Sequence, residues 1–408
     1  MKIAITADFL DIENIGGAGR VIVEIARGLV ESGHEVAIVA GGPHEFSEPR
    51  TVLGVPVHWS SFHYDTNAQR GISFFLGTRR RVRRAWSALP FSPDRVVHNQ
   101  PFTAYAIGAV AAPVTYLFHS PWALEYLAEQ FGEGSLARLG EHGAATKFQV
   151  QIRRRIERRA IARAEHIVCL SESMKGILEQ VHGSTGAIVE VHPGGVDLER
   201  FQPIDETAIA ATRQKYNVPP GALLFCSVRR MIPRTGLDTL LRALATAGDA
   251  LGPYRLVLPG SGSMRDELIE LTEELGLSDR VLFPGYIPDA DLPLLYAASD
   301  LSIVPTRSLE GFGLSTLESL SAGTPVIATP VGGSVEILRE LDARLLADKP
   351  GVEGIAERLR YWTAHRNELS TVARWCRPYV VSNYSWESLT NAALGAGTPI
   401  EGAPLTTA

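Results

Sequence analysis

The sequence predicts an α/β protein made of two domains, each with a parallel sheet flanked by helices. Strand-like apolar runs alternate with helical patterns almost throughout the chain. The order strand, glycine, helix then begins again about half a chain later. At 408 residues the chain is too long for one ordinary α/β core and suits two. Two similar domains are therefore expected.

The first half of the chain is predicted to form strands separated by helices. After the first strand, Ile22, Ile25 and Leu29 recur at the spacing of one buried helix face. Gly33 is the expected end of that helix. Strands are expected at Lys2–Thr6, Glu35–Ala40, Val55–Trp59, Arg95–His98, Val114–Phe118, His166–Leu170 and Ile188–His192.

The pattern begins again after a turn-rich joint at 193–197 and a polar, poorly patterned connector at roughly 198–221. A new strand at Leu223–Val228 leads through a glycine into a helix with one leucine-rich face. The leucines of that face are Leu237, Leu240, Leu241 and Leu244. Further strands are expected at Arg255–Leu258, Arg280–Pro284, Leu301–Pro305, Pro325–Ala328 and Arg344–Leu346.

These patterns set the expected domain boundaries. The first domain covers 1–195 and the second covers 196–375. A helical segment over 376–391 is expected to cross back to the first domain. The tail at 392–408 is small, polar and contains proline, and we expect it to be disordered.

Composition argues against several classes of protein. The net charge of −6 gives no indication of nucleic-acid binding. No Cys/His spacing fits a zinc site, and Cys169 and Cys226 lie inside apolar runs where burial is expected. From Met1 the chain enters a strand pattern without a signal-peptide pattern, and no apolar stretch of about 18 residues predicts a transmembrane helix. The expected location is the cytoplasm.

Two glycine loops follow predicted strands, where parallel sheets bind ligands. Gly16 and Gly17 open the first helix, and their exposed N–H groups and the helix dipole favour an anion. A plain flexible turn remains the alternative, because the spacing is not the dinucleotide fingerprint Gly-x-Gly-x-x-Gly. Gly260 and Gly262 form a second such loop, which is a weaker signal.

Arginines cluster where the second domain's first strand ends. Arg229 and Arg230 close that strand, and Arg234 and Thr235 precede Gly236 at the next helix start. Guanidinium groups near a helix N-terminus suit a diphosphate, which arginine holds through paired hydrogen bonds. We favour phosphate binding over the alternative of surface arginines, because Arg230 ends an apolar strand.

Three further polar residues follow strands. Glu310 lies on a loop and Glu318 in the next helix, where carboxylates accept hydrogen bonds from sugar and ribose hydroxyls. From the pattern alone, Ser315-x-x-Glu318 fits a helix capping box better than a ligand site. An exposed loop acid remains the alternative for Glu310. His119 closes a first-domain strand, where a structural histidine is the favoured interpretation.

Together these motifs resemble the retaining glycosyltransferases of family four, which have the GT-B fold of two Rossmann-like domains facing a central cleft. The strongest match is the paired-glutamate segment 310–318 with the glycine-proline turn in 322–328. Supporting matches are Gly16-Gly17, His119, Ser171-Glu172, Pro193-Gly194-Gly195-Val196-Asp197 and Phe283-Pro284-Gly285-Tyr286-Ile287. The resemblance covers most of the chain, to about Tyr384.

The resemblance implies roles for these residues. Arg230 binds the diphosphate, Glu310 contacts donor sugar hydroxyls, His119 lies against the sugar, and Glu318 binds ribose, which lifts it above the capping interpretation. Other implied donor contacts are Gly16, Gly17, Arg234, Thr235, Gly260, Gly262, Tyr286, Ile287, Gly311, Phe312, Gly313 and Leu314. The family usually has lysine at Thr235, and Arg234 is a candidate replacement. Trp122 and Tyr126 are guesses for acceptor contacts.

The implied activity is transfer of a hexose-type sugar from a UDP- or GDP-linked donor to an acceptor hydroxyl, with retention and without cofactor or metal. The donor half contains no evident Asp-x-Asp metal motif. Alternatives are a non-catalytic sugar-nucleotide-binding protein and a Rossmann oxidoreductase. Basic runs at 79–84 and 153–163 suit either an anionic membrane face or a solvated helix face, and we favour the latter. The acceptor, a small molecule, lipid or glycan, stays open.

Overall fold

The structure of the protein is a computed structural model that describes residues 1–10, 16–42, 47–52, 54–63, 72–131 and 139–395. The chain forms two compact units. Unit 1 contains the described residues of 1–125, 139–194 and 385–395, and unit 2 contains those of 126–131 and 195–384. Residues 396–408, most of the expected tail, lie outside the described part.

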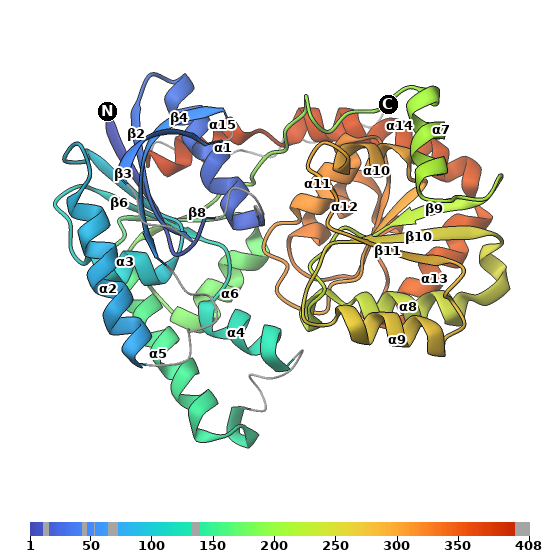
Figure 1. Ribbon diagram of the computed structural model, residues 1–408, viewed down its shortest axis with the longest axis horizontal. Coiled ribbons are helices and arrows are strands. Elements are labelled where there is room, and N and C mark those ends of the chain that lie inside the picture. Colours follow the sequence, from blue (N-terminus) through green and yellow to red (C-terminus); the bar gives the residue numbers. More distant parts are fainter. Residues whose placement is uncertain (11–15, 43–46, 53, 64–71, 132–138, 396–408) are drawn as a thin grey trace. The chain divides into compact units, whose positions relative to one another are not determined.

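Unit 1 is built on an eight-stranded sheet of order β3-β4-β2-β1-β5-β6-β7-β8 (Figure 1). Its strands are β1 (Lys2–Ala7), β2 (Glu35–Gly42), β3 (Ser47–Val52), β4 (Val55–His63), β5 (Arg95–His98), β6 (Val114–Phe118), β7 (His166–Cys169) and β8 (Ile188–Val191). All neighbouring strands are parallel except β3 and β4. The strand β3 was not predicted, because it is a short edge strand with a proline and little apolar character.

Helices between these strands, together with the late helix α15, complete unit 1, although the second half of α4 groups with unit 2. They are α1 (Gly17–Glu31), α2 (Ile72–Ser87), α3 (Pro101–Ile107), α4 (Trp122–Phe131), α5 (Ala144–Ile161), α6 (Glu172–His182) and α15 (Trp386–Ala393), with a 3₁₀ turn η1 (Leu139–Glu141). The predicted face of α1 is confirmed, since Ile22, Ile25 and Leu29 are fully buried. The late helix α15 packs on α1, where Gly28 leaves room for Thr390.

Unit 2 is built on a five-stranded parallel sheet of order β11-β10-β9-β12-β13. The strands are β9 (Leu223–Cys226), β10 (Tyr254–Pro259), β11 (Val281–Gly285), β12 (Leu301–Val304) and β13 (Val326–Ala328). The α-helices are α7 (Glu206–Lys215), α8 (Leu237–Ala247), α9 (Arg265–Glu274), α10 (Leu292–Ala298), α11 (Leu314–Ser321), α12 (Gly333–Asp342), α13 (Val352–Ala364) and α14 (Arg366–Asn383). Helices α8, α9 and α13 lie on one side of the sheet and α10 and α11 on the other (Figure 1).

Short 3₁₀ turns complete unit 2: η2 (Pro233–Thr235), η3 (Gly248–Leu251) and η4 (Ala343–Leu345). The last of these corrects a predicted strand at Arg344–Leu346, which makes one isolated bridge from Leu346 to Ala328. Asp342 causes the turn, because its carboxylate accepts from the backbone N–H and guanidinium of Arg344. Asp205 caps α7, which lies inside the connector where no regular pattern was recognised.

Both sheets reverse their strand order at one point, where open α/β sheets bind ligands. In unit 1 the reversal lies between β1 and β5, and in unit 2 between β9 and β12. The loop residues Gly16 and Asn99 therefore flank one switch point, and Arg229 and Glu310 flank the other. The strand order therefore determines which loop residues lie together at the switch point of each sheet.

Glycines bring the loops of unit 2 into backbone contact around its switch point. A Cβ atom on Gly236 would lie 2.0 Å from the carbonyl oxygen of Pro305, just after β12. On Gly332 it would lie 2.0 Å from the carbonyl oxygen of Glu310. Only glycine permits approaches this close. The loops after β9, β12 and β13 are therefore fixed against one another.

We expect Gly236→Ala to destabilise unit 2 more than Gly221→Ala does. Both glycines are left-handed, with φ of +74° and +75°, but a Cβ on Gly221 meets nothing within 4 Å. The control should lose ~1–2 kcal/mol from backbone strain alone. The clash at Gly236 should add a further ~1–3 kcal/mol. Urea unfolding measures both, and equal losses would show that the loop contact is not tight.

Candidate donor-binding site

Arg229 is the central cation of the unit 2 site, although the sequence argument gave the diphosphate to its neighbour Arg230. Arg229 follows β9, and only 8% of its side chain is exposed. Its Nη2 donates to Glu310 Oε2 at 2.5 Å and to Thr306 Oγ1 at 2.9 Å, and its Nη1 donates to Ser315 Oγ at 3.2 Å. The pair of strand-end arginines was visible in the sequence, but burial alone distinguishes them.

Glu310 is held on the opposite side of the switch point. Its side chain is 12% exposed, and Oε2 also accepts from Thr306 Oγ1 at 3.0 Å. Burial raises the pKa of this carboxyl, but the charge and hydrogen bond of Arg229, with the Arg234 charge, lower it below the usual value overall. Glu310 is therefore ionised and cannot be described as an exposed loop acid.

Arg234 holds the loop that carries Glu310 through its backbone. Its Nη1 donates to the carbonyl oxygen of Leu309 at 2.8 Å, and its own carbonyl accepts from Arg307 N at 2.9 Å. Leu309 has a φ of +56°, which is uncommon for a residue with a side chain. Such backbone strain persists where surrounding contacts fix it, and it clusters at ligand sites. Arg234 is one of those contacts.

The segment 310–314 lies between two helix N-termini. Gly313 is the N-cap of α11, and Gly332 is the N-cap of α12. Neither cap has a side-chain hydrogen bond, and Gly333 N donates to Glu310 O at 3.1 Å. Unsatisfied N–H groups and the helix dipoles make this segment favourable for an anion. The glycines Gly332 and Gly333 were not singled out from the sequence.

The predicted capping box at Ser315 is wrong. Helix α11 begins at Leu314 with Gly313 as N-cap, so Ser315 is already inside the helix. Its hydroxyl accepts from Arg229 instead. Glu318 lies further along α11, where its Oε2 accepts from the buried Tyr296 hydroxyl at 3.4 Å. The capping alternative for Glu318 is thereby removed.

Other predicted donor contacts have structural explanations of their own. A Cβ on Gly262 would lie 2.3 Å from Met231 O, and one on Gly260 3.0 Å from Arg229 O, so both glycines allow the loop after β10 to pack on the loop after β9. Thr235 is buried, and its hydroxyl lies 2.8 Å from the carbonyl oxygens of both Arg230 and Ile232. It stabilises the turn before α8.

The remaining predicted contacts of unit 2 differ in exposure. Phe312 is buried, whereas Tyr286 is 59% exposed and Ile287 is 9% exposed. The Arg230 side chain is 59% exposed, and its Nη2 donates to Glu129 Oε1 at 2.7 Å, in the part of α4 that groups with unit 2. Their assigned roles in donor binding stay predictions.

In unit 1, one asparagine connects His119 to the glycine loop. Gly16 is the N-cap of α1 and has no side-chain cap, and Gly17 is the first helical residue. Asn99 donates from Nδ2 to Ala18 O at 3.5 Å, and its Oδ1 lies 2.7 Å from His119 Nε2. Because Oδ1 can only accept, His119 Nε2 carries the proton, and Nδ1 is left as an acceptor. Asn99 was not predicted.

Burial sets the charge of His119. It lowers the pKa of His119 from 6.5 to about 4, so the ring is neutral at pH 7. Asp8, which follows β1, accepts from Thr103 N at 2.7 Å and Phe102 N at 3.2 Å at the start of α3. Burial raises the pKa of Asp8 to about 6. His119 can accept a hydrogen bond from a ligand hydroxyl but is not an acid at neutral pH.

Trp122, one of the two guessed acceptor contacts, packs into unit 1. Its backbone N donates to the buried Glu157 at 3.0 Å, and its ring lies 5.0 Å from the Arg153 guanidinium carbon and 6.4 Å from the Phe102 ring. Arg153 is 2% exposed, so it does not belong to the exposed basic run predicted over 153–163. Tyr126 lies on α4, and its contact with an acceptor stays a prediction.

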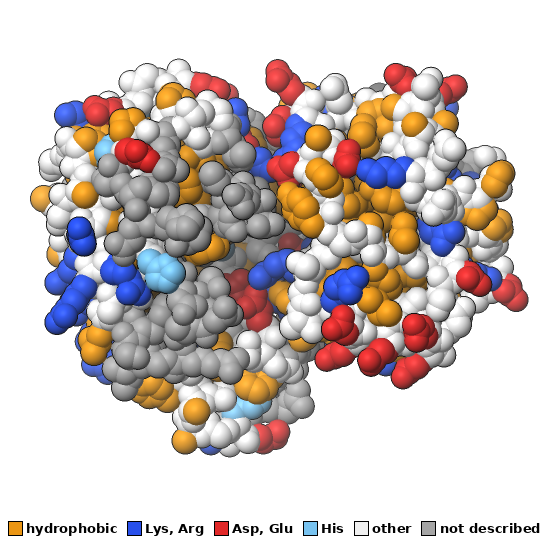
Figure 2. All heavy atoms as spheres, viewed as in Figure 1, with side chains coloured by type: hydrophobic (Ala, Val, Ile, Leu, Met, Phe, Trp, Pro, Cys, Tyr) orange, Lys and Arg blue, Asp and Glu red, His pale blue; other side chains and the backbone are white. Residues whose placement is uncertain are grey.

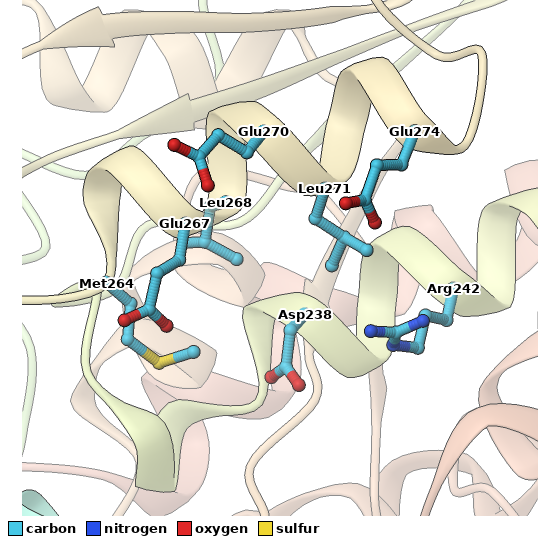
Figure 3. A pocket seen from close by; sticks show the side chains of 8 residues that line it. All are labelled: Asp238, Arg242, Met264, Glu267, Leu268, Glu270, Leu271 and Glu274. Atoms are coloured by element: carbon cyan, nitrogen blue, oxygen red, sulfur yellow. The ribbon is translucent and has the colours of Figure 1, made fainter.

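A separate hollow of about 200 Å³ lies between α8 and α9 (Figure 3). Its charged lining comes from Asp238 and Arg242 on α8 and from three glutamates of α9, namely Glu267, Glu270 and Glu274. Four carboxylates repel a diphosphate, so this hollow does not suit a nucleotide donor. Across the described ranges, no group of His, Cys, Asp or Glu gathers in a way that would hold a metal ion.

Two doubly wound domains with these switch points define the GT-B class of glycosyltransferase folds, and solved structures of this class match nearly the whole chain. Sucrose-phosphate synthase from Thermosynechococcus elongatus has a TM-score of 0.79 at 20% identity over 97% of both chains. WaaG, a glycosyltransferase involved in lipopolysaccharide biosynthesis, has a TM-score of 0.74 at 19% identity over 98% of this chain and 100% of that chain.

Family models then match both halves of the chain. "Glycosyltransferase Family 4" matches residues 15–200, and "Glycosyl transferases group 1" matches residues 208–374. Together the two matches show that the chain belongs to the group 1 glycosyltransferases of family 4.

Curated relatives match over part of their length. The GDP-mannose-dependent alpha-(1-6)-phosphatidylinositol monomannoside mannosyltransferase of Mycobacterium tuberculosis (strain ATCC 25618 / H37Rv) is 31% identical over 50% of this chain and 54% of the relative. The D-inositol 3-phosphate glycosyltransferase of Rhodococcus jostii (strain RHA1) is 34% identical over 58% of this chain and 53% of the relative. The matched region therefore spans about half the length of these relatives.

Replacing His119 should make stability less sensitive to acid. Its folded pKa of about 4 lies below the unfolded value of 6.5, so its contribution is present above pH 6.5 and is lost as the pH falls towards 4. At pH 5 the loss amounts to ~2 kcal/mol. His119→Gln should remove this loss, whereas the control His63→Gln, at an exposed site of unit 1, should follow wild type. Unfolding of unit 1 by urea at pH 7 and 5 gives the comparison, and identical pH slopes for wild type and His119→Gln would contradict it.

Proposed function

We propose that the protein is a retaining glycosyltransferase that moves a hexose-type sugar from a nucleoside diphosphate sugar to an acceptor hydroxyl. The observation that carries this proposal is the segment 310–314 at the unit 2 switch point. An ionised carboxylate for sugar hydroxyls lies there beside arginines and two helix N-termini for phosphates. The GDP-mannose dependence of one relative and the UDP and glucose bound to the related Anabaena HepE support this class of donor.

The chemical demand of the reaction is stabilisation of negative charge on the leaving diphosphate. Preorganised donors at such positions are typically worth ~2.7–4 kcal/mol each. Arg230, Arg234 and the N-termini of α11 and α12 fill this role in unit 2. Guanidinium groups take the place of a metal ion here. The departing phosphate oxygen accepts the acceptor's proton, so no side-chain base is required.

The unit 1 residues serve the sugar and the acceptor in this proposal. His119 is neutral at pH 7, and its Nδ1 accepts a hydrogen bond from a sugar hydroxyl. Gly16 and Gly17 lie at the start of α1, where free N–H groups and the helix dipole favour an anionic group. Water exclusion around the reacting carbon limits hydrolysis of the donor. The acceptor class remains small molecule, lipid or glycan.

The direct test incubates the protein with UDP-glucose, GDP-mannose or ADP-glucose and an acceptor panel. NMR of the product should show the anomeric configuration of the donor, and EDTA should leave the rate unchanged. A product of inverted configuration would exclude retention. Tight binding of a donor without hydrolysis or transfer would favour a non-catalytic sugar-nucleotide-binding protein instead.

Arg230→Ala should reduce turnover by at least ~100-fold, because it removes a donor that stabilises the leaving diphosphate. The side chain is 59% exposed, so the variant should keep its fold. Arg265→Ala, an exposed arginine at the start of α9, is the matched control. Initial rates at saturating donor measure the effect. A near-normal rate for Arg230→Ala would remove this residue from the mechanism.

We also propose that unit 1 docks on an anionic membrane face, the alternative to a solvated helix face. Tyr105 of α3 lies between two arginines, with Arg79 of α2 at 5.5 Å and Arg159 of α5 at 6.0 Å from its ring. Tyr105 thus brings one arginine of α2 close to one arginine of α5. Lys and Arg side chains gather on the edge of the molecule where α2 lies (Figure 2). Among the described residues, no helix is long and apolar enough to cross a bilayer.

Binding to anionic vesicles should depend on this surface. Replacing the exposed Arg80 and Arg84 with Gln should weaken co-sedimentation with phosphatidylglycerol vesicles by at least ~10-fold, since each arginine near the surface contributes ~1 kcal/mol. The same change on unit 2, at Arg265, whose side chain is 43% exposed, and at the exposed Arg366, should have little effect. High salt should release the wild type. Failure of the wild type to bind at low salt would mean that these arginines form a solvated helix face.

A further inference from the structure

Arg229 and Glu310 form a nearly buried ion pair across the switch point of unit 2. The side chains are 8% and 12% exposed, and they come from the loops that follow β9 and β12. An ion pair removed from water in this way costs desolvation energy, so it needs good geometry and further hydrogen bonds. Thr306 and Ser315 supply these, through contacts with Arg229 at 2.9 and 3.2 Å. The pair is therefore fixed rather than mobile.

The two oxygens of the Glu310 carboxylate differ in their surroundings. Oε2 accepts from Arg229 Nη2 at 2.5 Å and from Thr306 Oγ1 at 3.0 Å. Within the described part of the chain, the structure records no hydrogen bond to Oε1. A carboxylate oxygen has two acceptor positions. Oε1 is thus the oxygen that a ligand can use, and its direction is set by the contacts of Oε2.

We propose that Arg229 is a specificity-determining positioning residue: by holding Glu310 Oε2, it directs Oε1 at a hydroxyl of the donor sugar and so selects sugars that carry this hydroxyl. This inference rests on the donor site proposed above. It assigns Arg229 to the sugar end of the donor, whereas Arg230 and Arg234 belong to the diphosphate end. A site built to hydrogen-bond a hydroxyl rejects analogues that lack it.

The charges around the site support this division of roles. The Arg229 charge is already balanced by Glu310. Arg234, bound to Leu309 O, and the N-termini of α11 and α12 remain for the phosphates. Loss of Arg229 should therefore impair sugar recognition and leave nucleoside diphosphate binding intact.

Removal of Arg229 should also make sugar recognition depend on pH. The charged groups that face Glu310 are Arg229 from β9 and Arg234 from the turn before α8. Helix α11 contributes the Ser315 hydroxyl to Arg229, and α12 contributes the Gly332 and Gly333 backbone. Burial raises the pKa of Glu310, and Arg229 is the first of the groups that lower it. Without Arg229, the Glu310 carboxylate takes up a proton more readily as the pH falls. The protonated carboxyl then accepts hydrogen bonds from sugar hydroxyls less well.

The experiment compares wild type with Arg229→Met, which removes the charge at similar volume, and Arg229→Lys, which keeps it. Arg265→Met on α9 is the control. Calorimetric titration measures affinity for UDP, GDP, UDP-glucose and GDP-mannose, and for the 3-deoxy and 4-deoxy forms of whichever sugar nucleotide binds. Thermal unfolding checks that each variant is folded. Thr306→Val, which removes the other donor to Oε2, gives a second test should Arg229→Met not fold.

Wild type should bind one deoxy analogue ~10–100-fold more weakly than the parent donor, the range of a hydrogen bond to a charged group. Arg229→Met should lose most of this discrimination, and Arg229→Lys should recover part of it. Affinity for UDP or GDP should stay within about threefold of wild type in all variants, while the donor affinity of Arg229→Met should fall as the pH is lowered, because Arg229 no longer lowers the pKa of Glu310. Thr306→Val should also reduce the discrimination between the parent donor and its deoxy analogue, but by less than Arg229→Met does.

Two results would overturn the assignment. Full discrimination by Arg229→Met at every pH would show that Glu310 needs no positioning by Arg229. An equal loss of affinity for the bare nucleoside diphosphate would place Arg229 at the phosphates instead. If wild type binds none of the nucleotides, the proposed donor site itself is wrong. This result differs from the two above, which overturn only the role of Arg229.

Discussion

The ion pair between Arg229 and Glu310 connects the two strands between which the sheet of unit 2 reverses its order. Strands β9 and β12 are neighbours in space but lie far apart in the chain, and their following loops diverge to opposite sides. Side-chain contacts must therefore hold the two loops together. Arg229 does so through Glu310, Thr306 and Ser315. The strained Leu309 and the N-terminus of α11 lie in the loop that this arrangement holds.

Close backbone approaches complete the support of this loop. Gly236 and Gly332 each permit a contact that any side chain would block. The loop that carries Glu310 is thus held by neighbours on both sides before any ligand arrives. Preorganisation of this kind lowers the cost of stabilising charge that develops during a reaction. Unit 1 uses a different solution, in which Asn99 orients a neutral His119.

The sequence predicted the fold class, and the two sheets and their family confirm it. Apolar periodicity sufficed for α1 and α8 because one face of each packs on a sheet. It failed for α7, which has few buried residues, and for Arg344–Leu346, where one carboxylate favours a turn. Local polar contacts decided these two segments, and a hydrophobic pattern does not report them.

The sequence by itself determined which residue types were available at the strand ends: paired arginines, glycine loops, Glu310 and His119. Only the tertiary structure decided which of them share a site, because strand order depends on how the helices pack and not on the sequence of any one strand. Burial then separated Arg229 from Arg230, which are neighbours in the chain and identical in chemistry. Arg229 pairs with Glu310 inside unit 2, whereas Arg230 is 59% exposed and pairs with Glu129, because the irregular segment after β9 turns the two side chains to different neighbours.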